Sequence, residues 1–209
     1  GKRTAAAAVK IAVDMEKEKL IDKRTAITRL EPVQIEQLLH PTFDEDALKL
    51  ATKLAKGLPA SPGAATGKIY FNAAEAEVAV SNGEKVILVR LETSPEDLAG
   101  MVVAEGILTA RGGMTSHAAV VARGMGKCCV AGCSEIQVNE EKRLLTIGTE
   151  TFNEGDFISL NGTDGTVYKD KIKTVTPELS GDFGTIMAWA DEIRTLKIRT
   201  NADNPRDAI

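Results

Sequence analysis

Aromatic residues, histidines and cysteines are scarce in this sequence, and long apolar runs are missing from it. Of its 209 residues, 4% are aromatic, two are histidines and three are cysteines. No apolar run approaches the roughly 18 residues that a membrane span needs, and no signal-peptide pattern opens the chain. We therefore expect no membrane partner, and any histidine chemistry must fall on one of two imidazoles.

An excess of charge of one sign is also missing. The chain has 26 Lys and Arg against 30 Asp and Glu, a formal net charge of −4, and no block of basic residues. Because nucleic-acid binding needs a basic patch or stripe, we expect no nucleic-acid partner. With 43% hydrophobic and 27% charged residues, the composition is typical of a soluble globular protein of one or two domains.

The three cysteines, Cys128, Cys129 and Cys133, fall in one short apolar stretch. Their spacing gives no Cys-x-x-Cys pair, and adjacent residues of a strand point to opposite faces. We interpret them as small core residues of a protein in a reducing intracellular compartment, either the cytosol or an organelle. Metal binding or redox chemistry is the alternative.

The stretch around His117 carries the strongest signal for function. A buried strand is predicted over 106–110, followed by two glycines at 112–113 that allow a tight backbone turn. Thr115 or Ser116 can then cap a helix whose first turn holds His117. The apolar residues after His117 continue that helix, and Gly124 fits its C′ end.

This placement suits a covalent phosphoryl carrier. Backbone N–H groups at a helix start bind anions, and the positive end of the helix dipole favours the neutral, nucleophilic imidazole of His117. Gly113, Thr115 and Ser116 are the candidate phosphate-binding groups. The alternative is that His117 merely caps or packs against the helix start. Two arginines in this stretch, at 111 and 123, could reach a phosphate or form surface salt bridges, and the second is the weaker candidate because it lies six positions beyond His117.

The pattern along the chain changes twice. Residues 1–57 read as four helices, the last over 44–57, and the Pro- and Gly-rich stretch that follows marks a boundary near residue 58. Short strands and helices alternate from there to about residue 172, with hairpins over 136–147 and 157–168. Helical spacing returns within 173–197, before a final stretch at 198–209. His40 precedes a proline at the end of a predicted helix, and we assign it no chemistry.

Residues 112–126, Gly-Gly-Met-Thr-Ser-His-Ala-Ala-Val-Val-Ala-Arg-Gly-Met-Gly, resemble the phosphohistidine signature of the phosphoenolpyruvate-utilising enzymes. The likeness extends from Lys2 to Asp203 and thus covers nearly the whole chain. Met114, the Thr-Ser-His triplet and the Cys-Cys-Val at 128–130 are most similar to the dikinases of that group.

This resemblance implies an α/β fold, namely a swivelling β/β/α phosphohistidine domain flanked by helical linkers. It assigns residues 1–57 to a linker from the nucleotide-binding part, 58–172 to the carrier domain and 173–197 to a second linker. Residues 198–209 would begin a C-terminal phosphoenolpyruvate/pyruvate barrel. The implied partners are an N-terminal ATP-binding domain and that barrel in the same polypeptide, with a homodimer formed through regions outside the chain.

The activity implied by the resemblance is the reversible conversion of ATP, phosphate and pyruvate into AMP, pyrophosphate and phosphoenolpyruvate. His117 would take a phosphoryl group at one remote site and deliver it at another. Mg²⁺ would bind outside this chain, with a monovalent cation as a further candidate, and we expect no metal ligands within the chain. Thr115 is a candidate for regulatory phosphorylation by a kinase and phosphatase pair, against the alternative that it only caps the helix or lines the pocket.

Two other functions fit the same sequence. One is the carrier domain of a phosphoenolpyruvate synthase or of enzyme I of the sugar phosphotransferase system, and dependence on phosphate and pyrophosphate would distinguish these enzymes from a dikinase. The other is a scaffold module that keeps the fold without the chemistry.

Overall fold

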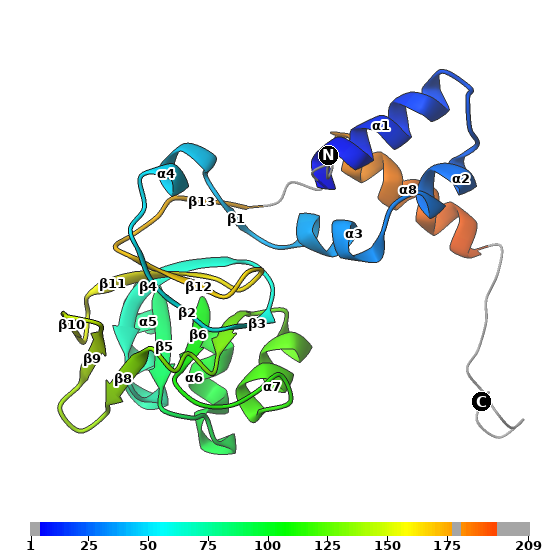
Figure 1. Ribbon diagram of the computed structural model, residues 1–209. Coiled ribbons are helices and arrows are strands. Elements are labelled where there is room, and N and C mark those ends of the chain that lie inside the picture. Colours follow the sequence, from blue (N-terminus) through cyan, green and yellow to red (C-terminus); the bar gives the residue numbers. More distant parts are fainter. Residues whose placement is uncertain (1–4, 177–180, 196–209) are drawn as a thin grey trace, which may run out of the picture. The chain divides into compact units, whose positions relative to one another are not determined.

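The computed structural model describes residues 5–176 and 181–195 and divides the chain into two compact units (Figure 1). The helical unit comprises Gly1–Leu39 and Glu178–Ile209, and the sheet unit comprises His40–Pro177. Within the described residues, no helix is long and apolar enough to cross a membrane.

Four helices build the described part of the helical unit: α1 (Ala5–Lys17), α2 (Lys23–Thr28), α3 (Pro32–Leu39) and α8 (Gly181–Thr195). The apolar face predicted for α1 is confirmed, because Val9, Ala12 and Val13 are buried in its core. Asp22 caps α2 by accepting a hydrogen bond from the Thr25 N–H at 2.7 Å.

An eight-stranded mixed sheet forms the centre of the sheet unit, in the order β2-β12-β11-β4-β5-β6-β7-β3. Its inner strands β4, β5, β6 and β7 are parallel, and the outer strands are antiparallel to their neighbours. The strand bounds are β2 Lys53–Lys56, β3 Leu58–Ser61, β4 Ala64–Tyr70, β5 Val86–Arg90, β6 Gly106–Thr109, β7 Cys128–Ala131, β11 Phe157–Asn161 and β12 Thr166–Lys169.

Helices cover one face of this sheet and a smaller sheet covers the other. The helical layer consists of α5 (Ala73–Ser81), α6 (Leu98–Val103) preceded by the 3₁₀ turn η1 (Pro95–Asp97), and α7 (His117–Met125). The smaller sheet is β8 (Ile136–Asn139), β9 (Leu144–Ile147) and β10 (Glu150–Asn153), all antiparallel. This arrangement is a β/β/α sandwich, so the predicted α/β fold class is confirmed.

The neighbouring thiols of β7 illustrate the two faces. Cys129 belongs to the apolar cluster beneath the helices, whereas Cys128 belongs to the cluster beneath the small sheet, together with Cys133. All three are free thiols and are buried. Burial raises the pKa of Cys129 to about 12 and that of Cys133 to about 11, and it raises the pKa of Cys128 further still. The interpretation as core residues is therefore confirmed.

The helix predicted over 44–57 is wrong. The helix α4 (Glu45–Lys49) ends after five residues, and Lys53–Lys56 is instead the edge strand β2, paired with β12. Ala55 is buried in the sheet core, so tertiary pairing prevails over the local helical spacing. A short pairing of β1 (Thr42–Phe43) with β13 (Thr174–Val175) also belongs to this unit.

The Pro- and Gly-rich stretch after residue 57 contains a strand rather than only a loop. Residues Leu58–Ser61 form β3, the strand at the edge of the sheet. Pro59 has no backbone N–H to donate, and an edge strand tolerates this loss because it pairs on one side only. The compact unit accordingly begins at His40, before the boundary predicted near 58. The predicted domain bounds stay predictions, and the barrel start at 198–209 lies outside the described residues.

The buried thiols make stability depend on alkaline pH. Unfolded thiols ionise near 9.0, while those of Cys129 and Cys133 keep their protons to higher pH in the folded chain. The unfolded state then binds fewer protons, so the free energy of unfolding should fall between pH 9 and 11 by up to about 1.4 kcal/mol per pH unit per thiol. Urea unfolding across this range measures the slope. A Cys129→Ala, Cys133→Ala variant should lose less stability with pH, and an unchanged slope in that variant would contradict the account.

Candidate functional site

His117 stands at the first position of α7, directly after the loop that leaves β6. The loop turns at Gly112, whose φ of +102° is a backbone conformation that side chains other than glycine rarely adopt. Ser116 is the N-cap residue, and its hydroxyl oxygen accepts a weak hydrogen bond from the Ala119 N–H at 3.4 Å. The strand, turn and cap predicted around His117 are therefore confirmed.

The helix ends two residues later than predicted. Gly126 adopts the left-handed conformation that closes α7, and Gly124 lies inside the helix. Either Gly124 or Gly126 could end the helix, because glycine suits the C′ position. The spacing of apolar residues does not indicate which of the two does so.

Three hydrogen bonds hold the base of the loop. The Thr109 side chain is fully buried and donates to the Arg111 carbonyl at 2.7 Å. Arg123 donates to the carbonyls of Met114 and Ala60, at 2.6 and 3.0 Å. The Arg123 guanidinium thus stabilises the loop over residues 110–116, the signature loop, by hydrogen bonds to backbone carbonyls. This role was not among those predicted for Arg123.

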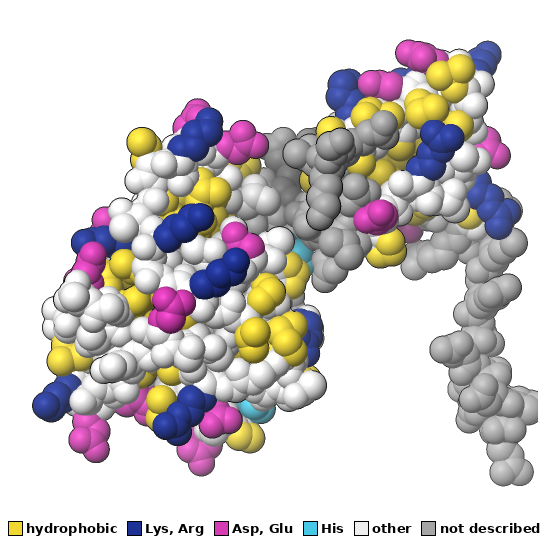
Figure 2. Space-filling view, in the orientation of Figure 1, with side chains coloured by type: hydrophobic (Ala, Val, Ile, Leu, Met, Phe, Trp, Pro, Cys, Tyr) yellow, Lys and Arg dark blue, Asp and Glu magenta, His cyan; other side chains and the backbone are white. Residues whose placement is uncertain are grey.

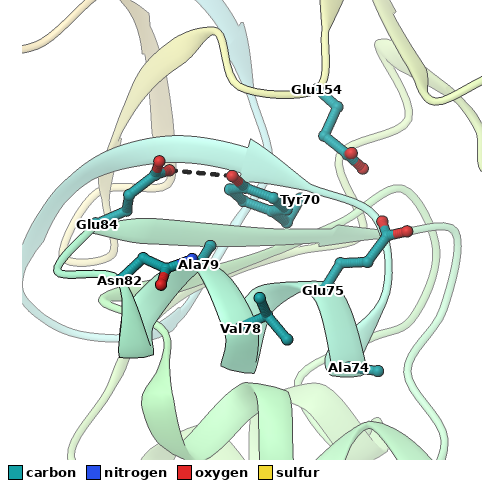
Figure 3. Close-up of a pocket in the computed structure, with 8 residues that line it drawn as sticks. All are labelled: Tyr70, Ala74, Glu75, Val78, Ala79, Asn82, Glu84 and Glu154. Carbon is teal, nitrogen blue, oxygen red and sulfur yellow. Dashed lines mark hydrogen bonds between the residues drawn. The ribbon is translucent and has the colours of Figure 1, made fainter.

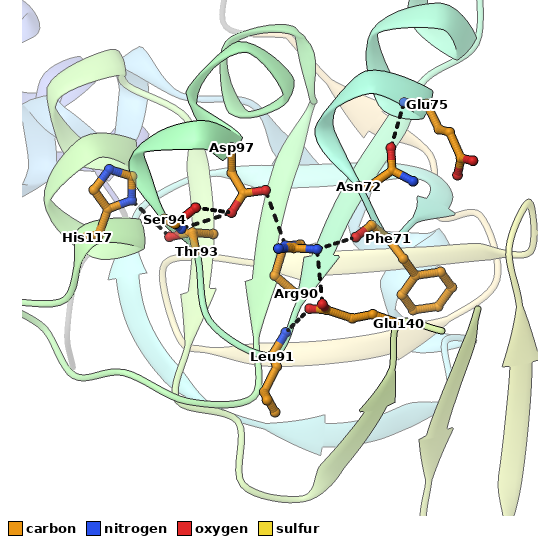
Figure 4. Close-up of polar contacts among 10 residues, drawn as sticks. All are labelled: Phe71, Asn72, Glu75, Arg90, Leu91, Thr93, Ser94, Asp97, His117 and Glu140. Atoms are coloured by element: carbon orange, nitrogen blue, oxygen red, sulfur yellow. Dashed lines mark hydrogen bonds and ion pairs between the residues drawn. The ribbon is translucent and has the colours of Figure 1, made fainter. Parts of the chain in front are cut away.

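Sequence reasoning missed the residue that contacts the His117 ring. The Thr93 hydroxyl lies 3.1 Å from His117 Nδ1, and Thr93 itself is only 6% exposed (Figure 4). The sequence indicated this proximity in part, because Thr93 lies in the loop after β5 and the residues before His117 lie in the loop after β6. Adjacent parallel strands end at the same edge of a sheet, so the loops after them meet there.

The candidate phosphate-binding residues lie in the loop and N-cap directly before His117. Gly113 and Thr115 are exposed, and Ser116 and His117 are half-buried. Because Nδ1 contacts Thr93, Nε2 is the candidate ring nitrogen for chemistry. Arg111 is also exposed in the loop. The site therefore combines an imidazole, a helix start and hydroxyl groups, which together can accept and hold a phosphoryl group.

A cavity of about 320 Å³ lies elsewhere in the sheet unit, lined by Tyr70 and three glutamates (Figure 3). Glu84 accepts a hydrogen bond from Tyr70, while Glu75 and Glu154 point toward one another. Burial and the charge of Glu75 raise the pKa of Glu154, and Arg143 opposes both effects. Because these carboxylates repel anions, the cavity does not suit a phosphate.

The other histidine is remote from this chemistry. His40 is half-buried and lines a cavity of about 220 Å³ that includes Gly126 and Lys127, at the opposite end of α7 from His117. Within residues 5–176 and 181–195, no group of three or more His, Cys, Asp or Glu side chains is arranged to hold a metal ion. On the face of the sheet unit that Figure 2 shows, basic and acidic side chains are interspersed.

The central part of the chain matches a known family. Residues 82–165, which include the Thr93 loop, α7 and the small sheet, match the family described as "PEP-utilising enzyme, mobile domain". This segment is therefore similar to the mobile domain of the PEP-utilising enzymes. The strand, glycine turn and His117 helix of the predicted signature all lie inside it.

The likeness to individual proteins covers all 209 residues. The chain is 59% identical to pyruvate, phosphate dikinase of Clostridium symbiosum, 59% to the chloroplastic pyruvate, phosphate dikinase 1 of Arabidopsis thaliana and 57% to the chloroplastic enzyme of Mesembryanthemum crystallinum. It spans 24% of the first of these proteins and 22% of the other two. The chain thus resembles one part of much longer enzymes.

Gly112 should be indispensable to the loop, and Gly113 should not. An added Cβ at Gly112 would lie 2.8 Å from Ser116 Cβ and would force an L residue into a φ of +102°. Gly112→Ala should therefore cost about 1–3 kcal/mol of unfolding free energy in urea titrations. Gly113→Ala is the matched control, because nothing lies within 4 Å of its added Cβ. Equal losses in both variants would contradict this account of the turn.

Proposed function

We propose that this chain is the phosphoryl-carrier portion of a pyruvate, phosphate dikinase, with His117 as the residue that becomes phosphorylated. The observation that carries the proposal is the setting of His117: a half-buried imidazole at the start of α7, with Nδ1 against Thr93. The similarity of all 209 residues to part of the dikinases supports the choice of enzyme. A synthase or an enzyme I remains the second candidate, since the mobile domain is common to PEP-utilising enzymes.

The His117 ring must present a lone pair to phosphorus. We assign the Nδ1–H tautomer, in which Nδ1 donates to Thr93 Oγ1 and Nε2 carries the free lone pair. Nε2 then forms a bond to phosphorus as the bond from phosphorus to the donor's leaving oxygen breaks, and the leaving oxygen keeps that electron pair. The ring gains positive charge, which the Thr93 oxygen stabilises through the Nδ1–H bond.

The rim residues complete the phosphate site in this proposal. The Ser116 oxygen already accepts from Ala119, so its O–H can donate to a phosphoryl oxygen. The unpaired backbone N–H groups that a helix has in its first turn would add further donors at the start of α7. Gly113 and Thr115 are exposed in the loop just before His117 and would be further contacts for the same oxygens.

The remaining steps belong to the longer protein. An N-terminal domain would supply the phosphoryl group from ATP with phosphate, releasing AMP and pyrophosphate, and a C-terminal barrel would transfer it to pyruvate. Mg²⁺ would accompany the nucleotide and phosphoenolpyruvate in those domains, as would any monovalent cation, and we assign neither ion a ligand in this chain. A homodimer would form through other regions as well.

Thr115 is in addition a candidate for regulation. It is exposed and lies two residues before His117, so a kinase could reach its hydroxyl. A phosphate fixed there would repel the incoming phosphoryl group and occupy its N–H donors. Control by a kinase and phosphatase pair would follow from this arrangement.

The decisive variant is His117→Asn in the full-length protein. With β-³²P-labelled ATP, Mg²⁺ and phosphate, the wild type should acquire an acid-labile, alkali-stable label that pyruvate removes. The variant should lose at least about 99% of that label, because this chain's other histidine, His40, lies at the opposite end of α7. His40→Asn is the control and should label normally. Equal labelling of His117→Asn would overturn the proposal. Labelling from phosphoenolpyruvate but never from ATP would favour enzyme I.

A further inference from the structure

We propose that Glu75 and Glu154 share one proton, which links the start of α5 to the turn after β10, and that this link breaks as the pH rises. The proposal goes beyond the proposed function, because it involves neither His117 nor the residues around it. Its physical basis is a pair of carboxyl groups from distant parts of the chain, which we call the carboxyl pair, beside the larger cavity (Figure 3).

One guanidinium serves both members of the carboxyl pair. Arg143, between β8 and β9, contacts Glu75 Oε1 through Nη2, and its Nη1 lies 3.1 Å from Glu154 Oε1. Glu75 stands in the first turn of α5, whereas Glu154 directly follows β10. Two carboxylates therefore meet a single cation, so full ionisation of the pair leaves one negative charge without a counterion.

The remaining oxygen of each carboxyl group lacks a donor. Glu75 Oε2 and Glu154 Oε2 are both shielded from solvent, and neither accepts a hydrogen bond from the part of the chain that the structure describes. The two carboxyl groups point toward one another in Figure 3. A buried carboxylate oxygen without a donor is costly, and one proton between the two oxygens gives both of them a hydrogen bond. The geometry therefore favours one bound proton, which belongs to the pair as a whole.

The other charged groups at this cavity are already engaged. At the other end of the cavity, Glu84 lies 3.1 Å from Lys68 Nζ and accepts from the Tyr70 hydroxyl at 3.0 Å. Burial and the neighbouring glutamates raise the pKa of Tyr70, which therefore keeps its own proton. Among the described residues, Arg143 is the one cation that forms an ion pair with either member of the carboxyl pair. A shared proton is thus the remaining way to offset the second negative charge.

The shared proton is held mainly by Glu154. Burial and then the negative charge of Glu75 raise the pKa of Glu154, and Arg143 offsets only part of that rise. The Glu154 side chain is 19% exposed and that of Glu75 is 33% exposed, which agrees with this assignment. An unfolded glutamate ionises near 4.5, so the folded chain keeps this proton to a higher pH. The stability that the proton contributes is therefore complete below pH 4.5 and is lost as the pH rises through the folded pKa of Glu154.

Loss of the proton to solvent should change the structure only locally. The two ionised groups repel one another and their buried oxygens require water, so the Glu154 side chain separates from α5. The backbone of the same turn stays attached to β4, because the Gly155 N–H donates to the Ile69 carbonyl at 2.9 Å. The pH-dependent element is therefore the side-chain link between α5 and the turn after β10.

Carbon-13 NMR of the glutamate carboxyl groups follows this proton directly in the 209-residue chain. Glu154 should titrate above pH 4.5. Glu75→Gln removes the neighbouring negative charge and should lower the titration midpoint of Glu154, whereas Arg143→Met removes the opposing cation and should raise it. Glu84→Gln alters the same cavity without touching the pair and is the matched control, so it should leave the midpoint unchanged.

The opposite signs distinguish a shared proton from a merely structural contact. Local unfolding would bring the midpoint of Glu154 toward 4.5 in both variants, because the side chain would then be exposed to water. Shifts of the same sign in Glu75→Gln and Arg143→Met would overturn the proposal. A wild-type midpoint at or below 4.5 would do so as well.

Glu154→Gln tests the contribution of the proton to stability. Its amide imitates the protonated acid, because the nitrogen can donate to Glu75 Oε2 while the oxygen still accepts from Arg143. In urea titrations from pH 4.5 to about 8, the unfolding equilibrium constant of the wild type should rise relative to that of Glu154→Gln, by up to about tenfold per pH unit. A constant ratio of the two equilibrium constants over this range would overturn the proposal, whatever the labelling of His117 shows.

Discussion

Parallel pairing between β5 and β6 is the constraint on which the site depends. The last residue of β5, Arg90, pairs with Thr109, the last residue of β6. The chain leaves both strands at the same edge of the sheet, so the Thr93 loop and the glycine turn before His117 have to meet. The hydrogen bond between Thr93 and His117 is therefore a product of sheet topology, made by residues 24 positions apart.

The other layers of the sandwich stabilise the Thr93 loop (residues 91–94) and the glycine turn before His117. The helices α5, α6 and α7 bury one face of the parallel strands, and the small sheet of β8, β9 and β10 buries the other. Glu140, at the tip of the β8–β9 hairpin, extends that second layer to the Thr93 loop through its bond to Leu91. Arg123, within α7, stabilises the glycine turn by donating a hydrogen bond to the Met114 carbonyl. The proposed carrier function would need such a rigid presentation, because the phosphoryl group would have to arrive at each of two sites in the same geometry.

Local chemistry in the sequence was sufficient to predict the elements around His117. A buried strand, a glycine that allows positive φ, a hydroxyl cap and a run of small apolar residues each leave a local signal, and all four are found. The same reasoning failed at Lys53–Lys56 and at Leu58–Ser61, whose strand character comes from pairing with β12 and β7. Thr93 and Arg90 were missed for a related reason. Thr93 contacts His117 and Arg90 contacts Glu140. These partners lie far away in the sequence, so no local pattern indicates the contacts. The phosphate-binding roles of Gly113, Thr115 and Ser116 stay predictions.

The central claim is that Nδ1 of His117 is held by Thr93, so that Nε2 carries the phosphoryl group. The most direct measurement is the linkage in the labelled full-length protein. Alkaline hydrolysis followed by chromatography separates the two phosphohistidine isomers. The geometry at Thr93 predicts that the label is recovered as the Nε2-linked isomer. Recovery of freshly labelled protein as the Nδ1-linked isomer would contradict the account, because that nitrogen would then have been free of Thr93 when it reacted.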